Sequence, residues 1–521
     1  MKKLFLIGIV FCSLSAVAQD TYMNEQLLNN SQDVIGTSRY VGMCGAMGAL
    51  GADLSVISWN PAGIGLYRKN DASITFGGLW NKNYIDEENR GAGTFDQAGF
   101  VYSFKTESDV CPYVNFAFNF QKKKNYFSNF YADNSNLLGI SQMDQLAELA
   151  SFGYATNRNI TGLVLDNNAL TPTTFSDGRE GYRNKYGGEF NKYTHHSEGS
   201  LRGWDFNIST NIKDRAFIGL TFGVDNIDYS SWTNYFEACK YVQNGEDIYG
   251  DYSIWNGYRI SGHGFNFKLG GIVLPFEGNS FRVGFTVESP TWYKLKSNAM
   301  MDYTYYKDDN TCETSKTVES YLEFKPYTPW KFRASMGSTI SNKFAWDVDY
   351  EYANYASMKQ RFSDYDSFGG YKDVVMNNHM QESLKGVHTI RAGVEIRPIA
   401  PLSFRLGYNF TSAAYDSDAN FDQGQIYNSP SMEYVTRTNY MLTKPVHIVG
   451  VGMGYKWKNF YFDLAYKIRH QEADFFAFDD SFTTPGYSFS DLNPDLSGAT
   501  LNPVPVDLTR HSITCTLGVK F

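Results

Sequence analysis

After its first 18 residues, the sequence lacks any apolar run long enough for a membrane-crossing helix, which needs about 20 such residues. Its mean hydropathy is −0.39, although 17% of its 521 residues are aromatic. It also lacks a Pro/Ser-rich linker, a block of like charge and a clean internal repeat, so nothing divides it into separate soluble cores.

The sequence also lacks the marks of nucleic-acid-binding proteins and of common hydrolases. Its formal charge is −9, and no basic tract interrupts this acidic balance. It contains no G-x-S-x-G or H-E-x-x-H motif, and His195-His196 has no partner at metal-ligand spacing. We therefore expect no enzymatic activity, no cofactor, no metal site and no nucleic-acid partner.

Residues 1–18 are typical of a secretory signal. Lys2 and Lys3 precede an apolar run, and Ala16-Val17-Ala18 supplies the small residues of a cleavage site. We predict an exported protein whose mature chain begins at Gln19. Loss of the two lysines would take the formal charge from −9 to −11.

What the sequence does contain is one alternating pattern, repeated along the chain. Apolar residues alternate with small or polar ones over ten or more positions, as expected for a β-strand with two different faces. One example has Val114, Phe116, Phe118 and Phe120 alternating with Asn115, Ala117, Asn119 and Gln121. Strands of this length and regularity are typical of membrane barrels rather than of soluble sheets.

Fourteen candidate strands follow from this pattern. They lie near 72–84, 97–106, 112–126, 200–213, 216–237, 257–275, 280–306, 316–339, 344–361, 386–397, 402–414, 444–456, 460–478 and 507–521. Short turns such as 107–111 alternate with mostly longer loops, which is the pattern of outer-membrane barrels. We predict an all-β fold, a transmembrane antiparallel β-barrel over residues 71–521, with both ends of the chain in the periplasm.

The last candidate strand adds an independent indication. His511, Ile513, Cys515, Leu517 and Val519 share one face, and the chain ends on Phe521. Such an ending resembles the signal that the barrel-insertion machinery recognises. We therefore expect that machinery and outer-membrane lipid as partners, and an outer-membrane location in a Gram-negative-type bacterium.

A glycine- and alanine-rich segment precedes the first strand. It runs from Gly36 to Leu66 with few charges, and Gly42, Gly45, Gly48 and Gly51 recur every third residue. Because glycine permits close approach of backbones, we predict that residues 19–70 form a small plug, or hatch, in the lumen. A surface loop or a linker is the alternative.

This segment ends in Asn60-Pro61-Ala62. With this motif between a glycine-rich segment and fourteen strands, the chain resembles the FadL-type outer-membrane transporters of long-chain fatty acids and other hydrophobic compounds. The resemblance implies that Asn60, Pro61 and Ala62 hold the hatch, and that substrate leaves through a gap at a kink in the third strand. That strand has no Gly or Pro beyond Pro112, so the sequence itself does not indicate a kink. An Asn-Pro turn entering the first strand is the alternative reading of the motif.

The longest predicted loop, from about 127 to 199, contains a short amphipathic helix. Ile140, Met143 and Leu146 fall at helical spacing, and Phe152 lies just beyond them. These four residues are candidates for an apolar surface that captures substrate. Such a stripe is also what the loop's own small core would require.

Charged residues fall on the face that is predicted to line the lumen. They are Arg282, Glu288, Asp347, Asp349, Glu351, Arg391, Glu395, Arg405, Asp463 and Lys467. Glu395 and Arg405 flank one turn nearly opposite each other, which predicts an ion pair rather than a ligand site.

Cysteine is scarce, with five residues after the predicted signal. Cys239 and Cys312 are expected in neighbouring extracellular loops, and an oxidising compartment permits a disulfide between them. Two separate thiols are the alternative, because a bond needs their α-carbons within about 7 Å.

Together these features predict passive uptake of long-chain fatty acids or other hydrophobic small molecules through a plugged, monomeric barrel. The alternatives are a general porin for polar solutes and a surface receptor or adhesin. A plug separates the first two, because a filled lumen blocks ion flow.

Overall fold

The computed structural model describes residues 33–82, 91–184, 186–243, 245–307, 312–313, 317–362, 371–416, 419, 429–483 and 494–521. The predicted signal at 1–18 and the first part of the predicted plug therefore lie outside the described residues. In the described part of the chain, no helix is long and apolar enough to cross a membrane.

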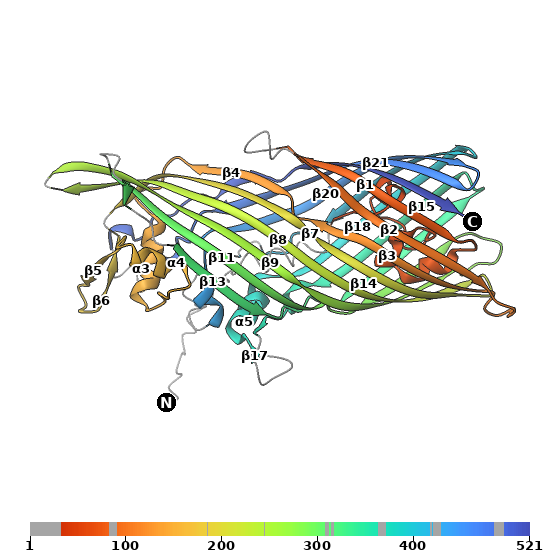
Figure 1. Cartoon of the computed structure of the whole chain (residues 1–521), viewed down its shortest axis with the longest axis horizontal. Coiled ribbons are helices and arrows are strands. Elements are labelled where there is room, and N and C mark those ends of the chain that lie inside the picture. Colours follow the sequence, from red (N-terminus) through yellow and green to blue (C-terminus); the bar gives the residue numbers. More distant parts are fainter. Residues whose placement is uncertain are drawn as a thin grey trace, which may run out of the picture.

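Fourteen antiparallel strands of the described chain form a closed barrel (Figure 1). They are β1 (Asp71–Asn81), β2 (Gly91–Lys105), β3 (Tyr113–Asn125), β7 (Gly187–Ile212), β8 (Ala216–Gln243), β9 (Glu246–Val273), β10 with β11 (Arg282–Glu288 and Trp292–Lys307), β14 with β13 (Lys331–Ile340 and Thr317–Phe324), β15 (Phe344–Asn354), β18 (Gly386–Ile399), β19 (Leu402–Thr411), β20 (Tyr440–Trp457), β21 (Phe460–Phe476) and β23 (Arg510–Lys520). β1 pairs with β23 from Asp71↔Lys520 to Asn81↔Arg510, which closes the barrel. The predicted number and order of strands are confirmed.

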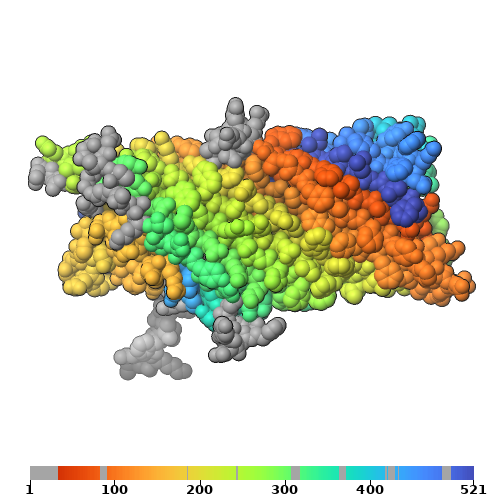
Figure 2. Space-filling model, viewed as in Figure 1, coloured from red at the N-terminus to blue at the C-terminus, as the bar shows by residue number. Residues whose placement is uncertain are grey.

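The two ends of the barrel differ. One end, here called the turn end, carries the C-terminus and encloses the N-terminal segment (Figure 1). The other, the loop end, carries α3, α4, β5 and β6. In Figure 2, side chains close the wall between neighbouring strands on the face in view.

The remaining elements lie in the N-terminal segment and in the connections between the barrel strands, except that β4 and β22 continue β3 and β23 along the wall. They are α2 (Ser38–Gly42), η2 (Leu54–Ser58), η3 (Pro61–Leu66), β4 (Ser128–Asn134), α3 (Gln142–Ser151), α4 (Ile160–Asp166), β5 (Thr171–Thr174), β6 (Glu180–Arg183), β12 (Cys312–Glu313), η4 (Tyr355–Ser357), β16 (Arg361–Phe362), β17 (Tyr371–Lys372), α5 (Val374–Ser383), η6 (Pro430–Tyr434), η7 (Ser481–Thr483), η8 (Pro494–Leu496) and β22 (Val504–Asp507).

The strand faces have the predicted opposite character. On β8, Ile218, Leu220 and Phe222 are exposed on the outside, whereas Thr221 is buried on the inside. Nine of the ten charged residues predicted to face the lumen are buried, and Arg282 is half-buried. An apolar outer face and a polar inner face are what a barrel in lipid requires.

Tyrosine and histidine form a repeated pair on the outside of the barrel. In each pair the tyrosine hydroxyl lies 2.8 Å from histidine Nδ1: Tyr350 with His388, Tyr408 with His447, and Tyr466 with His511. Tyrosine is enriched where a barrel meets the membrane–water boundary. The pairs therefore suit that boundary.

Several of the fourteen strands are interrupted, among them the third, the seventh and the eighth. Ser289-Pro290-Thr291 separates β10 from β11, and residues 325–330, which include two prolines, separate β14 from β13. Proline donates no backbone hydrogen bond, so it ends a ladder. The third strand is also broken, at Tyr126-Phe127 between β3 and β4, after a register shift between Lys122 and Lys124. It therefore bends without an internal Gly or Pro.

The predicted disulfide is wrong. Cys239 lies within β8 rather than in a loop, and its buried Sγ is a free thiol that donates to the Gly250 carbonyl at 3.3 Å. Cys312 begins β12, which pairs with β11, and β9 lies between β11 and β8. Three strand spacings amount to about 14 Å, about twice the span of a disulfide.

Candidate functional site: the lumen around the N-terminal segment

Residues 33–70 form a compact segment inside the barrel (Figure 1). Its three short helices are α2, η2 and η3. Each follows a residue whose side chain accepts a backbone N–H of the first turn, namely Thr37, Asp53 and Asn60. These local caps explain why a sequence so rich in glycine folds at all, because capping satisfies N–H groups that a short helix leaves open.

Asn60-Pro61-Ala62 joins two parts of this segment to the wall. Asn60 Oδ1 accepts the Ala62 N–H at 3.2 Å, and its Nδ2 donates to the Gly48 carbonyl at 2.8 Å. The Pro61 carbonyl accepts a hydrogen bond from Ser209 Oγ of β7 at 2.9 Å. The contacts of the motif thus link the glycine-rich turn to β7, and its role in holding a hatch stays a prediction.

Glycines in the wall make room for the motif. A Cβ at Gly219 of β8 would lie 2.4 Å from the Pro61 carbonyl carbon. A Cβ at Gly270 of β9 would lie 2.2 Å from Asn60 Oδ1, and one at Gly284 of β10 would lie 2.9 Å from Asn60 Nδ2. A side chain at any of these three positions would therefore collide with the motif.

Two inward carboxylates of β15 hold the glycine-rich turn. Asp349 accepts the backbone N–H groups of residues 47 and 48 at 3.2 Å, and Asp347 accepts those of residues 49 and 50 at 3.1 and 2.7 Å. A Cβ at Gly48 would lie 2.4 Å from Asp349 Oδ1, so glycine is needed there. Four backbone N–H groups of the turn are thus bonded to two side chains of β15.

An ion pair fastens the start of the described segment. Asp33 bonds Lys467 at 2.8 Å and also bonds Arg510, both of which point inward from the wall. Burial alone would raise the pKa of Asp33, but Arg510 and Lys467 hold it well below its ordinary value. Asp33 is therefore a charged contact between segment and barrel.

The predicted ion pair between Glu395 and Arg405 is confirmed, with Arg405 Nε 2.7 Å from Glu395 Oε2. The same carboxylate also binds Arg397 at 2.6 Å and Arg39 of the N-terminal segment at 3.0 Å. Sequence reasoning missed Arg39, because 356 positions separate it from Glu395 and no local spacing connects them.

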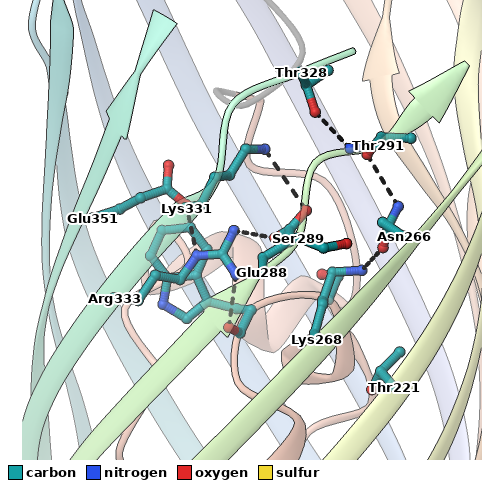
Figure 3. A network of polar contacts seen from close by, with 12 residues as sticks. Thr221, Asn266, Lys268, Glu288, Ser289, Thr291, Thr328, Lys331, Arg333 and Glu351 are labelled. Carbon is teal, nitrogen blue, oxygen red and sulfur yellow. Dashed lines mark hydrogen bonds and ion pairs between the residues drawn. The ribbon is translucent and has the colours of Figure 1, made fainter. Parts of the chain in front are cut away.

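On the loop-end side of the segment, a cavity of about 80 Å³ lies in the lumen. Figure 3 shows its polar wall, where Arg333 donates to Glu288 at 2.5 Å and to Glu351 at 2.6 Å. In the same view Thr328 Oγ1 accepts the Thr291 N–H at 2.8 Å. The break between β10 and β11 is thus tied to the break between β13 and β14.

Trp59, the residue before the motif, forms the floor of this cavity. The guanidinium carbons of Arg391 and Arg333 lie 3.5 and 4.3 Å from the centre of its ring. Buried cation–π contacts of this kind contribute about 2 kcal/mol each. These contacts join the loop-end side of the N-terminal segment to β14 and β18.

Apolar side chains occupy the barrel beyond the cavity. Leu201, Tyr293 and Tyr355 line the cavity and also belong to a buried apolar cluster, here called the mid-barrel cluster. Its other members include Ile227, Ile260, Leu295, Leu322, Phe324, Met358, Phe362, Met376 and Met380. A water-filled porin lumen is polar at this level, so this lumen is of a different kind.

The four residues proposed to capture substrate are not a shared exposed face. Ile140, Met143 and Leu146 are buried in a cluster at the loop end that includes Leu163, and only Phe152 is exposed, at 38%. The stripe is therefore the core of the loop, which was the other reading of the same spacing. The spacing alone could not separate the two, since both need one apolar helix face.

Truncation of this stripe is expected to act on stability. Leu146→Ala should destabilise the loop-end cluster by about 2–5 kcal/mol, because it leaves a cavity in a packed core. Phe152→Ala, which removes an exposed ring from the residue that directly follows α3, is the matched control and should cost much less. Hydrogen exchange of residues 142–166 measures both. Equal protection in the two variants would contradict the assignment to a core.

Comparison with known proteins gives matches among solved structures. No family model matches the chain, and no curated protein matches it. A FadL homologue from Pseudomonas aeruginosa has a TM-score of 0.51 at 11% identity, covering 94% of this chain and 99% of that chain.

Two toluene transporters match more weakly. TbuX of Ralstonia pickettii has a TM-score of 0.43 at 12% identity and covers 92% of this chain and 98% of its own. TodX of P. putida has a TM-score of 0.46 at 10% identity and covers 94% and 99%. Since the match to the FadL homologue covers nearly the whole of both chains, this protein has the fold of the FadL-type transporters.

Proposed function

We propose that this protein mediates passive uptake of hydrophobic small molecules across the outer membrane of a Gram-negative-type bacterium. In this proposal residues 1–18 are the signal, residues 19–70 are the plug, residues 71–521 are the barrel, and the protein acts as a monomer. The observation that carries the proposal is the mid-barrel cluster, a set of apolar side chains inside the lumen.

The contents of the lumen support uptake of apolar rather than polar solutes. A polar solute gains nothing from apolar walls and loses its hydration there, whereas an apolar molecule gains about 25 cal/mol per Å² of surface removed from water. At the turn end, the contacts of Asn60, Asp347, Asp349 and Arg39 would hold the segment across the path of ions.

Within that class we propose long-chain fatty acids alongside other hydrophobic compounds. Leu201, Tyr293 and Tyr355 would receive the aliphatic or aromatic part. Lys331 and Arg391 line the same cavity and would favour an anionic group at its end. A receptor or adhesin would have no use for apolar walls inside the lumen.

The test measures conductance and uptake on the same preparation. In planar bilayers the purified protein is expected to show no large steady conductance, because the segment fills the turn end. In proteoliposomes it is expected to accelerate entry of radiolabelled palmitate or toluene over empty liposomes. A large steady conductance with no acceleration of either compound would favour a porin and end the proposal.

A further inference from the structure

A second cavity, of about 250 Å³, lies at the turn end between the N-terminal segment and the wall. The segment contributes Arg39, Asp53 and Tyr67, and the wall contributes residues of β1, β19, β20, β21 and β23 together with the turn between β18 and β19. This second cavity is here called the seam cavity. Helix α2 separates it from the cavity on the loop-end side, because Arg39 of this helix lines the seam cavity and Tyr40 lines the other one. The seam cavity therefore belongs to the face of the segment opposite the mid-barrel cluster.

The seam cavity carries one positive charge in excess. Its five cationic residues are Arg39, Arg397, Arg405, Lys456 and Lys520. Its carboxylates are Asp53, Asp71 and Asp463, to which Glu395 is added because it binds three of the arginines. Burial alone would lower the pKa of Arg39, but Glu395 and Asp53 raise it above its ordinary value, so its guanidinium stays charged.

Each carboxylate of the seam cavity is already bound by the protein. Asp53 Oδ1 accepts Thr37 Oγ1 at 2.8 Å and the Ser55 N–H at 2.9 Å. Asp71 accepts a hydrogen bond from Tyr461 OH at 3.0 Å, and Asp463 accepts one from Arg405 Nη1 at 2.5 Å.

Lys456, by contrast, makes no ion pair with any residue that the structure describes. The excess positive charge is therefore assigned to Lys456.

The buried side chain of Tyr67 also lines the seam cavity. Tyr67 is 4% exposed, and its hydroxyl has no hydrogen-bond partner among the described residues. An unpaired buried hydroxyl costs about 1–3 kcal/mol, so a ligand atom that accepts its proton would be stabilised. Leu54, Pro401 and Tyr455 add apolar and aromatic surface to the same cavity.

We propose that the seam cavity binds one carboxylate, carried by a small organic acid or by the head of a transported amphiphile. Lys456 Nζ and the Tyr67 hydroxyl are its direct donors, and Leu54, Pro401 and Tyr455 contact the attached carbon chain. A single carboxylate neutralises the one excess charge. The apolar surface beside the donors favours an organic acid over an inorganic anion. Binding of a small acid stands apart from the proposed uptake, whereas binding of an amphiphile rests on it.

The test uses the full-length protein in lipid nanodiscs and equilibrium dialysis with three probes at pH 7. Butyrate carries the carboxylate alone, laurate carries it on a long chain, and dodecanol carries the chain without the charge. Lys456→Gln is expected to weaken carboxylate binding about threefold to tenfold, and Tyr67→Phe about threefold. Dodecanol binding should not change in either variant.

Lys458→Gln is the matched control, because it removes the same charge two positions away in the turn between β20 and β21, outside the cavity lining. Weakened butyrate and laurate binding in Lys456→Gln supports a site for free organic acids. Weakened laurate binding with no butyrate binding supports the amphiphile head.

Unchanged affinity in both Lys456→Gln and Tyr67→Phe would overturn the proposal. Equal weakening by Lys458→Gln, or no saturable carboxylate binding by the unaltered protein, would overturn it as well. Palmitate uptake in proteoliposomes is a separate readout, so failure of the proposed function is distinguishable from failure of this site.

Discussion

Replacing Asn60, Pro61 and Ala62 together by glycine is expected to leave the barrel folded and to open it to ions. The change removes both side-chain bonds of Asn60 and the fixed backbone angle of Pro61. Together these losses weaken docking of the segment by about 3 kcal/mol. None of the three residues belongs to a barrel strand, so closure of β1 on β23 is unaffected.

The measurement combines single-channel conductance with heat-modifiable migration in gels, which reports a folded barrel. Steady openings are expected in the variant and not in the unaltered protein. The matched control replaces Thr171, Pro172 and Thr173 of β5 by glycine, since this sequence also contains a central proline but lies at the loop end. A folded variant that stays silent in bilayers would show that the motif does not hold the segment.

The barrel could be predicted from sequence because lipid imposes a chemical contrast on every strand. Alternation marked β3, β19 and β21 without any knowledge of their partners. The same contrast disappears where strands leave the membrane. β7 begins at Gly187 and β9 at Glu246, earlier than the predicted 200 and 257, in extensions whose inward face mixes polar residues with buried apolar ones such as Tyr193, Tyr252 and Ile254.

The breaks in the wall could be predicted only in part. Pro290 explains why β10 ends, and a single search for proline would have found it. The break in the third strand has no such mark, since Tyr126 and Phe127 are ordinary strand residues. It follows from a register shift against β7, and register depends on a partner strand that the sequence does not display.

The contacts of the site were likewise predictable only in part. The Glu395–Arg405 pair was predictable because a tight turn places the two residues opposite each other. The contacts of Asp347 and Asp349 were not, since their partners are backbone N–H groups about 300 positions earlier, which any residue other than proline can offer. The motif predicted a contact between the segment and the wall, but not that three wall glycines leave the space for it.

Those wall glycines give the second large expected effect. Gly270→Val should displace Asn60, because its Cβ would lie 2.2 Å from Asn60 Oδ1. Overpacking of this kind costs about 1–3 kcal/mol, which corresponds to an acceleration of amide exchange of about fivefold to 150-fold in the displaced segment.

Gly271→Val provides the control, because the next residue faces outward, where the nearest atom to a new Cβ is 3.9 Å away. Both variants add the same side chain to the same strand, so effects on β9 itself cancel in the comparison. Exchange at residues 47–62, followed by mass spectrometry, should rise in Gly270→Val and not in Gly271→Val. Equal exchange in the two variants would mean that the segment does not depend on the space left by Gly270.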